Sequence, residues 1–314
     1  MLVGAHEVEV FEGARARLEA IAYRLLGSAS DAEDAVQDTF LRWHSADRAL
    51  IETPEAWLTK VLTNICLNRL TSARARRETY VGQWLPEPVF AGDWMLGPSD
   101  TVEQRESVSI AMLTLMERLS AKERVVYVLR EAFGYSHGEI AEVLDLTESN
   151  CQQVYRRAKQ HLADDRRRVA VDAAAARKIV EEFLAAALSG RTDSLVRMLT
   201  DDVISIGDGG GVVFSVPQPI TGALRVARFL RTLFKPSEAK WEMIGGRPDL
   251  FASVANGVPA LVMVVGDRVV GVFSLDVTAD GIAAVHAQAN PGKLTRATRQ
   301  WAVSEHGEPL ADDW

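Results

Sequence analysis

Side chains that can hydrogen-bond to nucleic acid gather between Glu148 and Leu162. Apolar residues recur there at the spacing i, i+3, i+4, i+7 and i+11, which is typical of one buried helix face. They are Cys151, Val154, Tyr155, Ala158 and Leu162. The other positions carry amides, a hydroxyl and cations, which are groups that contact base edges and phosphates. We expect DNA contacts from Ser149, Asn150, Gln152, Gln153, Arg156, Arg157 and Lys159.

Two shorter predicted helices position this one. Ser120 with Glu123, and Ser136 with Glu139, have the spacing of capping boxes, which begin helices. The dipeptide Asp145–Leu146 predicts a tight turn before the polar helix. Two short helices, a turn and a polar-basic helix indicate a helix-turn-helix whose last helix enters the major groove. An ordinary helical hairpin with a solvated basic face would have the same local pattern, so this stretch alone leaves both interpretations open.

A second basic region lies in the predicted helix Glu55–Arg77, which Pro54 begins. From Lys60 to Arg77 it holds five basic residues and no acidic one, although the whole chain has a net charge of −8. Capture of single-stranded DNA needs cations and stacking groups. Trp57 could serve as such a group or simply pack in the core. The candidate residues are Trp57, Asn64, Asn68, Arg69, Arg74, Arg76 and Arg77.

An acidic helix is predicted upstream of the basic one. Gly27 ends a first amphipathic helix over 11–26, and Ser30 with Glu33 predicts a capping box for the next helix. Residues 1–55 hold 11 acidic residues against 5 basic ones. Taken alone, such a face is explained by solvation and the helix dipole. Its outward residues are Asp31, Asp34, Gln37 and Asp38.

The order of these elements resembles the extracytoplasmic-function sigma factors of RNA polymerase. The stretches "AYRLLGSASDAEDAVQDTFLRW" (22–43) and "PEAWLTKVLTNICLNRL" (54–70) resemble domain two of that family, and residues 107–168 resemble domain four. The resemblance implies that the acidic helix binds the β′ clamp of core RNA polymerase, with domain four at the β flap. It also implies that the helix 54–77 reads the minus-ten element of promoter DNA and that the helix 151–162 reads the minus-thirty-five element. The implied polymerase contacts are Asp31, Glu33, Asp34, Gln37, Asp38 and Leu41.

The connection between the two domains is not a plain linker, because it is rich in large apolar residues. Pro86, Pro88 and Pro98 exclude a continuous helix, so we expect an extended segment that packs against another part of the chain. The string "WLPEP" (84–88) resembles a motif of the sigma-factor subgroup that has a SnoaL-like extension at its C-terminal end. Its residues are Trp84, Leu85, Pro86, Glu87 and Pro88.

After residue 168 the pattern changes to helices followed by strands. Helices are predicted over 170–189, 192–199 and 222–234, and strands over 203–207, 241–244, 250–255, 260–265, 269–278 and 282–289. Gly266–Asp267 and Asp280–Gly281 predict tight hairpin turns. The pattern favours an α+β cone, and it resembles the SnoaL-like fold, whose sheet surrounds a pocket.

Two further strings in this region resemble motifs of the same subgroup. They are "DGGG" (Asp208, Gly209, Gly210, Gly211) and "NPGKL" (Asn290, Pro291, Gly292, Lys293, Leu294). Val212 stands where the subgroup has Lys, and Gly292 where it has Asp. Successive glycines permit close approach of another segment. By resemblance, these motifs tie the extra domain to the sigma core, so that it acts as a built-in regulator.

Catalytic chemistry in this cone would need pocket carboxylates or a histidine, and the candidates are Asp202, Asp208, Asp276 and His286. No pair has convincing acid–base spacing. Asp202 and Asp276 lie near element ends, where we expect surface positions, and a histidine inside a strand is more often a core residue. We therefore predict no enzyme, no catalytic residue, no metal and no cofactor. Cys66 and Cys151 are expected as buried free thiols.

The fold class predicted is multidomain: two all-α sigma domains, the second a helix-turn-helix, followed by an α+β SnoaL-like cone. The expected boundaries are 1–79, a linker at 80–106, then 107–168 and 169–314. We expect a sigma factor that directs core RNA polymerase to promoters, is monomeric when free and can hold a small ligand in the cone. Without a signal peptide or a membrane-length apolar run, a cytoplasmic protein is expected. A ligand-sensing repressor, or a cyclase or hydrolase fused to a DNA-binding module, is the alternative.

Overall fold

The computed structural model describes residues 5–78, 80–98, 101–162, 173–312 and 314, without the side chains of residues 5–6, 48, 73–78, 102–103 and 173. The chain forms two compact units. The helical unit comprises Met1–Thr79, Gly92–Val108 and Met112–Asp164, and the α+β unit comprises Tyr80–Ala91, Ser109–Ala111 and Asp165–Trp314. Among the described residues, no helix combines the length and the apolar character needed to cross a membrane.

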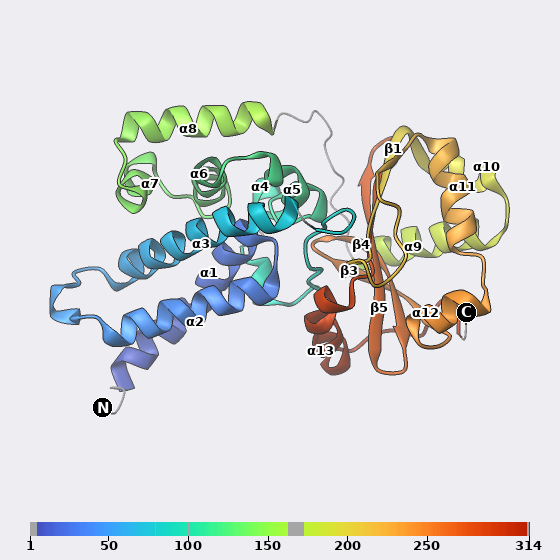
Figure 1. Cartoon of the computed structure of the whole chain (residues 1–314), viewed down its shortest axis with the longest axis horizontal. Helices are drawn as coiled ribbons and strands as arrows, with labels where there is room; N and C mark the ends of the chain where they lie inside the picture. The colour runs from blue at the N-terminus through green and yellow to red at the C-terminus, as the bar shows by residue number, and fades with distance from the viewer. Residues whose placement is uncertain (1–4, 79, 99–100, 163–172, 313) are drawn as a thin grey trace. The chain divides into compact units, whose positions relative to one another are not determined.

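Three long helices form the first part of the helical unit (Figure 1): α1 (Ala5–Leu26), α2 (Ala29–Ser45) and α3 (Pro54–Glu78). Gly27 ends α1 with a positive φ of 67° and donates its N–H to the Tyr23 carbonyl, as expected for a C-cap. The predicted cap of α2 is wrong by two residues. Ser28, not Ser30, accepts the Asp31 N–H, because α1 and α2 are separated by only two residues.

The second part of the helical unit contains α6 (Ala121–Glu131), α7 (His137–Leu144) and α8 (Glu148–His161), preceded by the short α4 (Val102–Glu106). The helix α5 (Ile110–Leu115) includes residues of both units. Both predicted capping boxes are present, at the starts of α6 and α7. Asp145 adopts a left-handed conformation with φ of 52° in the turn between α7 and α8. The helix-turn-helix is therefore confirmed.

The core of the helix-turn-helix follows the predicted apolar stripe. Cys151, Val154, Ala158 and Leu162 are buried against α6 and α7. Tyr155 departs from the prediction and stays half-buried, because its hydroxyl donates to the Glu131 carboxylate at the edge of the core. Cys66 and Cys151 are buried free thiols, as expected.

The α+β unit is built on one six-stranded sheet in the order β2-β1-β6-β5-β4-β3. The meander of β3 (Asp249–Ala255), β4 (Val258–Val265), β5 (Arg268–Thr278) and β6 (Gly281–Gln288) is antiparallel, as predicted. The strand β1 (Leu199–Asp208) runs parallel to β6 and antiparallel to the short β2 (Ile220–Thr221). The predicted strand 241–244 is wrong, because these residues belong to α12 (Glu238–Ile244).

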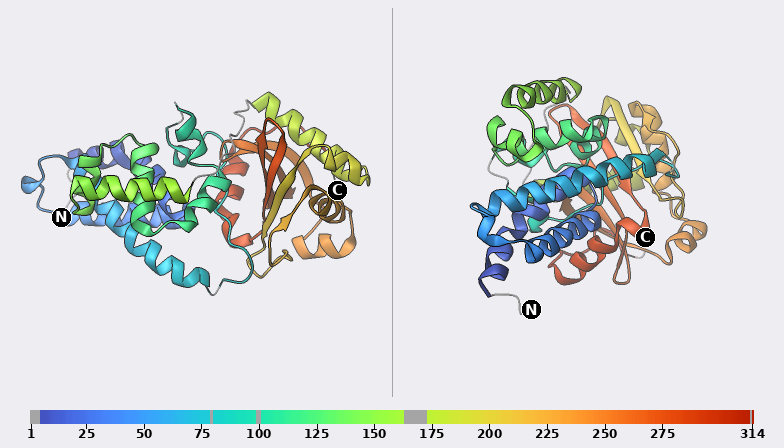
Figure 2. Two further views of the ribbon diagram at one scale, coloured as in Figure 1. Left: turned by 90° about the horizontal axis from the view of Figure 1, so that it is seen from above. Right: turned by 60° about the vertical axis from the view of Figure 1, so that its left-hand side comes forward.

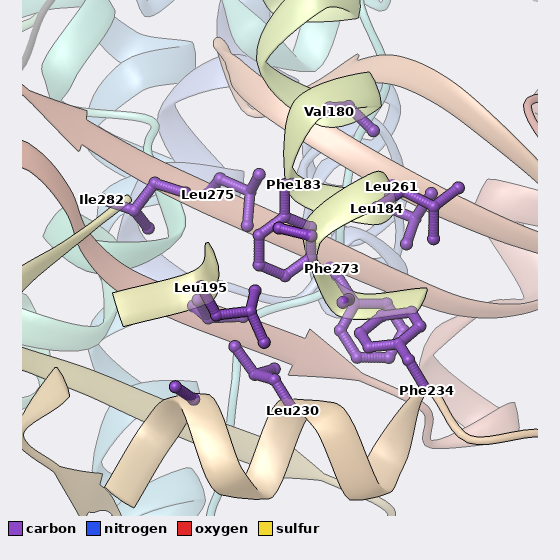
Figure 3. Packing of buried hydrophobic residues seen from close by; sticks show 14 of the residues in the cluster. Val180, Phe183, Leu184, Leu195, Leu230, Phe234, Leu261, Phe273, Leu275 and Ile282 are labelled. Carbon is purple, nitrogen blue, oxygen red and sulfur yellow. The ribbon is translucent and has the colours of Figure 1, made fainter. Parts of the chain in front are cut away.

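Helices cover both faces of this sheet (Figure 2). On one face, α9 (Ala173–Leu188), α10 (Thr192–Val196) and α11 (Ala223–Leu233) enclose an apolar core that includes Phe183, Leu230 and Phe273 (Figure 3). On the other face, α13 (Thr295–Val303) packs its Trp301 against a second cluster that includes Phe90. The α+β architecture is therefore confirmed, with one sheet between two layers.

Candidate nucleic-acid interface and linker latch

The polar face of α8 presents most of the predicted DNA-contacting side chains to solvent. Gln152 is half-buried, and the six others are exposed: Ser149, Asn150, Gln153, Arg156, Arg157 and Lys159. Thr147 accepts the Asn150 N–H at 3.2 Å and so caps the helix. The arginine Nε of Arg157 lies 3.9 Å from the Glu123 carboxylate, and Lys159 lies over the Tyr155 ring at 5.7 Å. A helix with exposed amides and cations on one face can contact base edges and phosphates.

The predicted DNA-contacting residues of α3 have more varied surroundings. Asn68 is exposed and Asn64 half-buried. Trp57 is half-buried, and its ring centroid lies 5.7 Å from that of Trp43, so it packs beside the core. Arg74, Arg76 and Arg77 belong to α3, but their side chains lie outside the described residues.

Arg69 contacts the acidic helix. Its guanidinium donates to Asp38 at 2.7 Å and lies 3.8 Å from Asp34 and 3.9 Å from Asp31. The single positive charge of Arg69 therefore offsets one of the three negative charges around it, on residues that were expected to face outward. Asp31, Glu33 and Asp38 are half-buried, while Asp34, Gln37 and Leu41 are exposed.

Two buried arginines connect the parts of the helical unit. Arg24 of α1 donates to Ser107 Oγ at 2.9 Å and to the Leu96 carbonyl, both in the segment that follows the linker motif. Arg124 of α6 donates to the Arg24 carbonyl at 3.1 and 3.2 Å and to the Glu117 carboxylate. Burial lowers the pKa of Arg24 to about 10 and that of Arg124 to about 9, which leaves both charged at neutral pH. Their hydrogen bonds join α1 to α6.

The three motifs of the linker and the α+β unit meet at one buried carboxylate, that of Asp208. We call this contact the latch: Tyr80, Leu85, Asp208, Gln288, Asn290 and Lys293. Asp208 is 1% exposed and ends β1. It accepts the Tyr80 hydroxyl at 2.7 Å, the Leu85 N–H at 2.9 Å and the Lys293 ammonium at 2.6 Å. Burial, and then the Asp208 carboxylate, raise the pKa of Tyr80 above its ordinary value.

Lys293 secures the linker from the other side. Its ammonium also donates to the Leu85 carbonyl at 2.7 Å and lies over the rings of Tyr80 and Trp84, at 4.8 and 4.3 Å from their centroids. Aromatic faces stabilise a partly desolvated cation. The lysine of "NPGKL" therefore binds the carboxylate of "DGGG" and the backbone of "WLPEP" at once.

Close packing explains the glycine at position 210. Its φ is 62°, and a Cβ there would lie 2.3 Å from Asn290 Cγ. Asn290 in turn donates to the Tyr80 hydroxyl at 2.7 Å and accepts the Gly292 N–H at 2.9 Å. Val212, which replaces the usual lysine of the subgroup motif, is 72% exposed. The loop thus needs glycine for close approach, as predicted from its sequence.

Several backbone groups of the linker are paired with the α+β unit. The prolines of "WLPEP" have no N–H to satisfy, and Gln288 donates to the carbonyls of Leu85 and Pro86 at 3.3 and 3.2 Å. Farther on, Val89 N–H donates to the Asn256 side chain at 3.0 Å, and Phe90 forms a bridge with Ala255. This pairing covers part of β3, one of the two edge strands of the sheet.

Sequence reasoning missed several residues of this contact: Tyr80, Asn256, Gln288 and Gln300. Asn256–Gly257 is a recognisable hairpin signal, but only its position beside the linker makes it a partner for Val89. The others have no local pattern, because residues more than a hundred positions apart contact one another.

Two of the four candidate catalytic residues, Asp276 and His286, lie side by side. Asp202 is exposed, as expected, and Asp208 belongs to the latch. The predicted surface position of Asp276 is wrong: it is 3% exposed, and its carboxylate lies 3.2 Å from Nδ1 of the buried His286. Because it alternates with the core residue Leu275 on β5, Asp276 lies on the sheet face opposite the Phe183 core.

Comparison with known proteins identifies the family. Residues 10–76 match the model of Sigma-70 region 2, and residues 109–162 match Sigma-70, region 4. The chain is 38% identical over 225 residues to the ECF RNA polymerase sigma factor SigJ of Mycobacterium tuberculosis (strain ATCC 25618 / H37Rv), covering 71% of this chain and 72% of that protein. The chain belongs to the ECF RNA polymerase sigma factors. It is a transcription initiation factor, and sigma factors of this family bind core RNA polymerase and promoter DNA.

A second relative and a solved structure extend the match to the α+β unit. Probable ECF RNA polymerase sigma factor SigI of M. tuberculosis (strain CDC 1551 / Oshkosh) is 31% identical over 288 residues, covering 89% of this chain and 92% of its own. The crystal structure of M. tuberculosis SigJ superposes with a TM-score of 0.70 at 30% identity and covers 92% of this chain and 98% of its own. These coverages include sheet as well as helices, so the α+β unit is part of the shared fold of this sigma factor.

Proposed function

We propose that this sigma factor reads the minus-thirty-five element with α8 and the minus-ten element with α3, and that its α+β unit regulates initiation through the latch. The observation that carries the proposal is the set of exposed amides and cations on α8, whose opposite face packs Cys151, Val154 and Ala158 into the core of the helix-turn-helix. Arg156 and Gln153 lie on consecutive turns of this exposed face, where one can contact a phosphate and the other a base edge.

The minus-ten assignment has support from exposed Asn68 and from the basic composition of α3. Arg69 contributes less positive charge to DNA than expected, because its guanidinium is paired with Asp38. We therefore give Arg69 a second role, which is to hold α3 against the acidic face of α2.

We propose that the exposed part of this acidic face binds the β′ clamp. Asp34 is 66% exposed at its side chain and Leu41 56% exposed overall, so a charge and an apolar contact are both available to a basic partner. Contact of the helix-turn-helix region with the β flap is a further part of the proposal.

The regulatory proposal follows from where the linker lies. Tyr80–Ala91 belongs to the α+β unit, although it connects two segments of the helical unit. When extended, these twelve residues could span about 40 Å. While the latch holds them on the α+β unit, this length does not contribute to the connection between the two promoter-reading helices. Opening the latch would make this length available to the connection. The latch therefore controls how far α3 and α8 can separate.

Run-off transcription with core RNA polymerase tests these assignments. The template is a promoter that the full-length protein itself selects from a random library. Arg156→Ala is expected to lower transcript yield about tenfold, as a lost phosphate or base contact costs about 1–3 kcal/mol. Arg225→Ala, which changes an exposed arginine of α11, is the matched control. Equal transcript yields from both variants would show that α8 does not contribute to promoter recognition.

The same assay with Asp208→Asn shows whether the latch raises or lowers transcript yield. Truncation after residue 168 is a poorer test, because it also removes the surface on which Leu85, Val89 and Phe90 are buried. A changed yield from the point variant supports regulation by the latch, whereas an unchanged yield contradicts it.

A further inference from the structure

The α+β unit contains a cavity of about 140 Å³ between the sheet and the helices α11 and α12. Its wall is mostly apolar and includes Phe229, Leu233, Phe234, Met263, Phe273 and Ala287. An apolar cavity of about this size holds a benzene-sized molecule in other proteins. The cavity therefore fits a compact ring compound of about six to nine heavy atoms.

Two polar side-chain atoms of the wall lack a hydrogen-bond partner among the described residues. They are Ser215 Oγ and Trp314 Nε1, and Trp314 is 92% buried because only 8% of it is exposed. Ser215 lies against β1, since a Cβ on Gly207 would be 2.7 Å from its hydroxyl oxygen. An indole N–H can only donate, and a hydroxyl can donate. A ligand that accepts a hydrogen bond would therefore satisfy a buried donor, whose lack of a partner is otherwise costly.

The charged residues of the wall are already engaged. Asp208 is paired with Lys293 in the latch. The Lys240 ammonium donates to the carbonyls of Thr232, Leu233 and Lys235 at 2.6, 2.9 and 2.6 Å, and burial lowers its pKa. Among the described residues of this wall the one cation, Lys240, already donates its N–H groups to carbonyls, so an anionic ligand would have no charged partner here. Burying an unpaired charge is strongly unfavourable. The ligand should be neutral.

Apolar side chains at the mouth give a path into the cavity. Phe214 and Met243 line it and are 74% and 46% exposed. They lie side by side, because the Phe214 N–H is 3.4 Å from the Met243 sulfur. A single backbone-to-thioether contact between a loop and the short helix α12 can separate without unfolding the sheet.

We propose that this cavity binds a neutral, benzene-sized molecule with one hydrogen-bond-accepting oxygen, such as an aryl ketone. The ring packs among Phe229, Phe234 and Phe273, and the oxygen accepts from Ser215 or Trp314. The proposal concerns a binding site of the α+β unit and does not rest on promoter recognition. Failure of ligand binding would leave the transcription results unchanged.

The test is a ligand-observed NMR titration of the full-length protein with three matched probes. Acetophenone has the ring and the acceptor, ethylbenzene has the same shape without an acceptor, and benzoate carries a charge. Acetophenone should bind about fivefold more tightly than ethylbenzene, the value of one net hydrogen bond. Benzoate should bind at least tenfold more weakly than acetophenone. Equal affinities of acetophenone and ethylbenzene would overturn the acceptor assignment, and no binding of either at millimolar concentration would overturn the site.

Two variants locate the binding. Ala287→Leu places a larger side chain in the cavity wall and should abolish binding of both neutral probes, whereas the matched control Ala185→Leu, on the exposed side of α9, should leave it unchanged. Ser215→Ala and Trp314→Phe each remove one of the two candidate donors, and one of these variants should lower acetophenone affinity about fivefold relative to ethylbenzene. Should Ala287→Leu fail to fold, these two variants decide together, and a loss of acetophenone preference in neither would overturn the proposal. Unchanged acetophenone binding by a folded Ala287→Leu protein would place the ligand elsewhere.

Discussion

Replacing Asp208 by Asn is expected to release the linker segment Tyr80–Ala91 from the α+β unit. The substitution keeps the shape of the side chain but removes the charge that pairs with Lys293 at 2.6 Å. Asp208 has a fully buried side chain, and the Lys293 side chain is only 12% exposed. Removing one partner of a buried ion pair costs about 3–5 kcal/mol, because the other charge is left uncompensated.

The expected change in linker opening follows from this cost. The Leu85 N–H and the Tyr80 hydroxyl also lose a charged acceptor, but Asn retains one acceptor oxygen, so we take about 3 kcal/mol in total for opening of the segment. At 1.36 kcal/mol per tenfold change, this is roughly a 150-fold rise in the open fraction.

Hydrogen–deuterium exchange of the full-length protein measures that fraction. The informative amides are those of Leu85 and Val89, which donate to Asp208 and Asn256, since the prolines between them have none. The matched control is Asp201→Asn, an exposed carboxylate on the same strand. Exchange of the linker peptide that is no faster in Asp208→Asn than in Asp201→Asn would refute the reasoning. A Lys293→Met change on top of Asp208→Asn should restore part of the protection, because it removes the stranded charge.

Three further predictions concern other sites. Asp34→Asn should weaken binding to core polymerase about three- to tenfold in a fluorescence-anisotropy titration. Glu52→Gln is the control, and equal affinities of the two variants would show that Asp34 is not part of the interface. Arg24→Met should destabilise the helical unit by about 3–5 kcal/mol in urea unfolding, because buried carbonyls lose their donor. The control Arg15→Met changes a half-exposed residue and should cost under about 1 kcal/mol. Similar urea midpoints for the two variants would contradict this prediction. Because burial raises the folded-state pKa of Tyr80 above its unfolded value of about 10, its contribution to stability should be complete below that pH and be lost as pH rises above it. Tyr80→Phe should flatten the fall in the urea midpoint of the α+β unit between about pH 9 and 11, and an equally steep fall would exclude Tyr80 as its source.

Much of the secondary structure could be predicted because its signals are local. The capping boxes of α6 and α7 lie within four residues each, and the apolar stripe of α8 repeats within three turns. The hairpin turns at Gly266–Asp267 and Asp280–Gly281 are equally local, and the meander they connect was found correctly. Where two signals competed, prediction failed: Trp241–Ile244 has strand-forming residues, but it forms the end of α12.

The sequence by itself determined the three helices of the helix-turn-helix region, the acidic and basic helices and their order, because periodicity, caps and charge are properties of neighbouring residues. Only the tertiary structure decided that Arg69 pairs with Asp38 of the acidic face, that Asp276 is buried beside His286, and that the linker belongs to the α+β unit. Each of these depends on contacts between residues far apart in the chain. The latch shows the reason most clearly: Asp208 holds Leu85 from 123 positions away and Lys293 from 85. The burial that makes this ion pair strong exists only once the sheet and the linker have packed together.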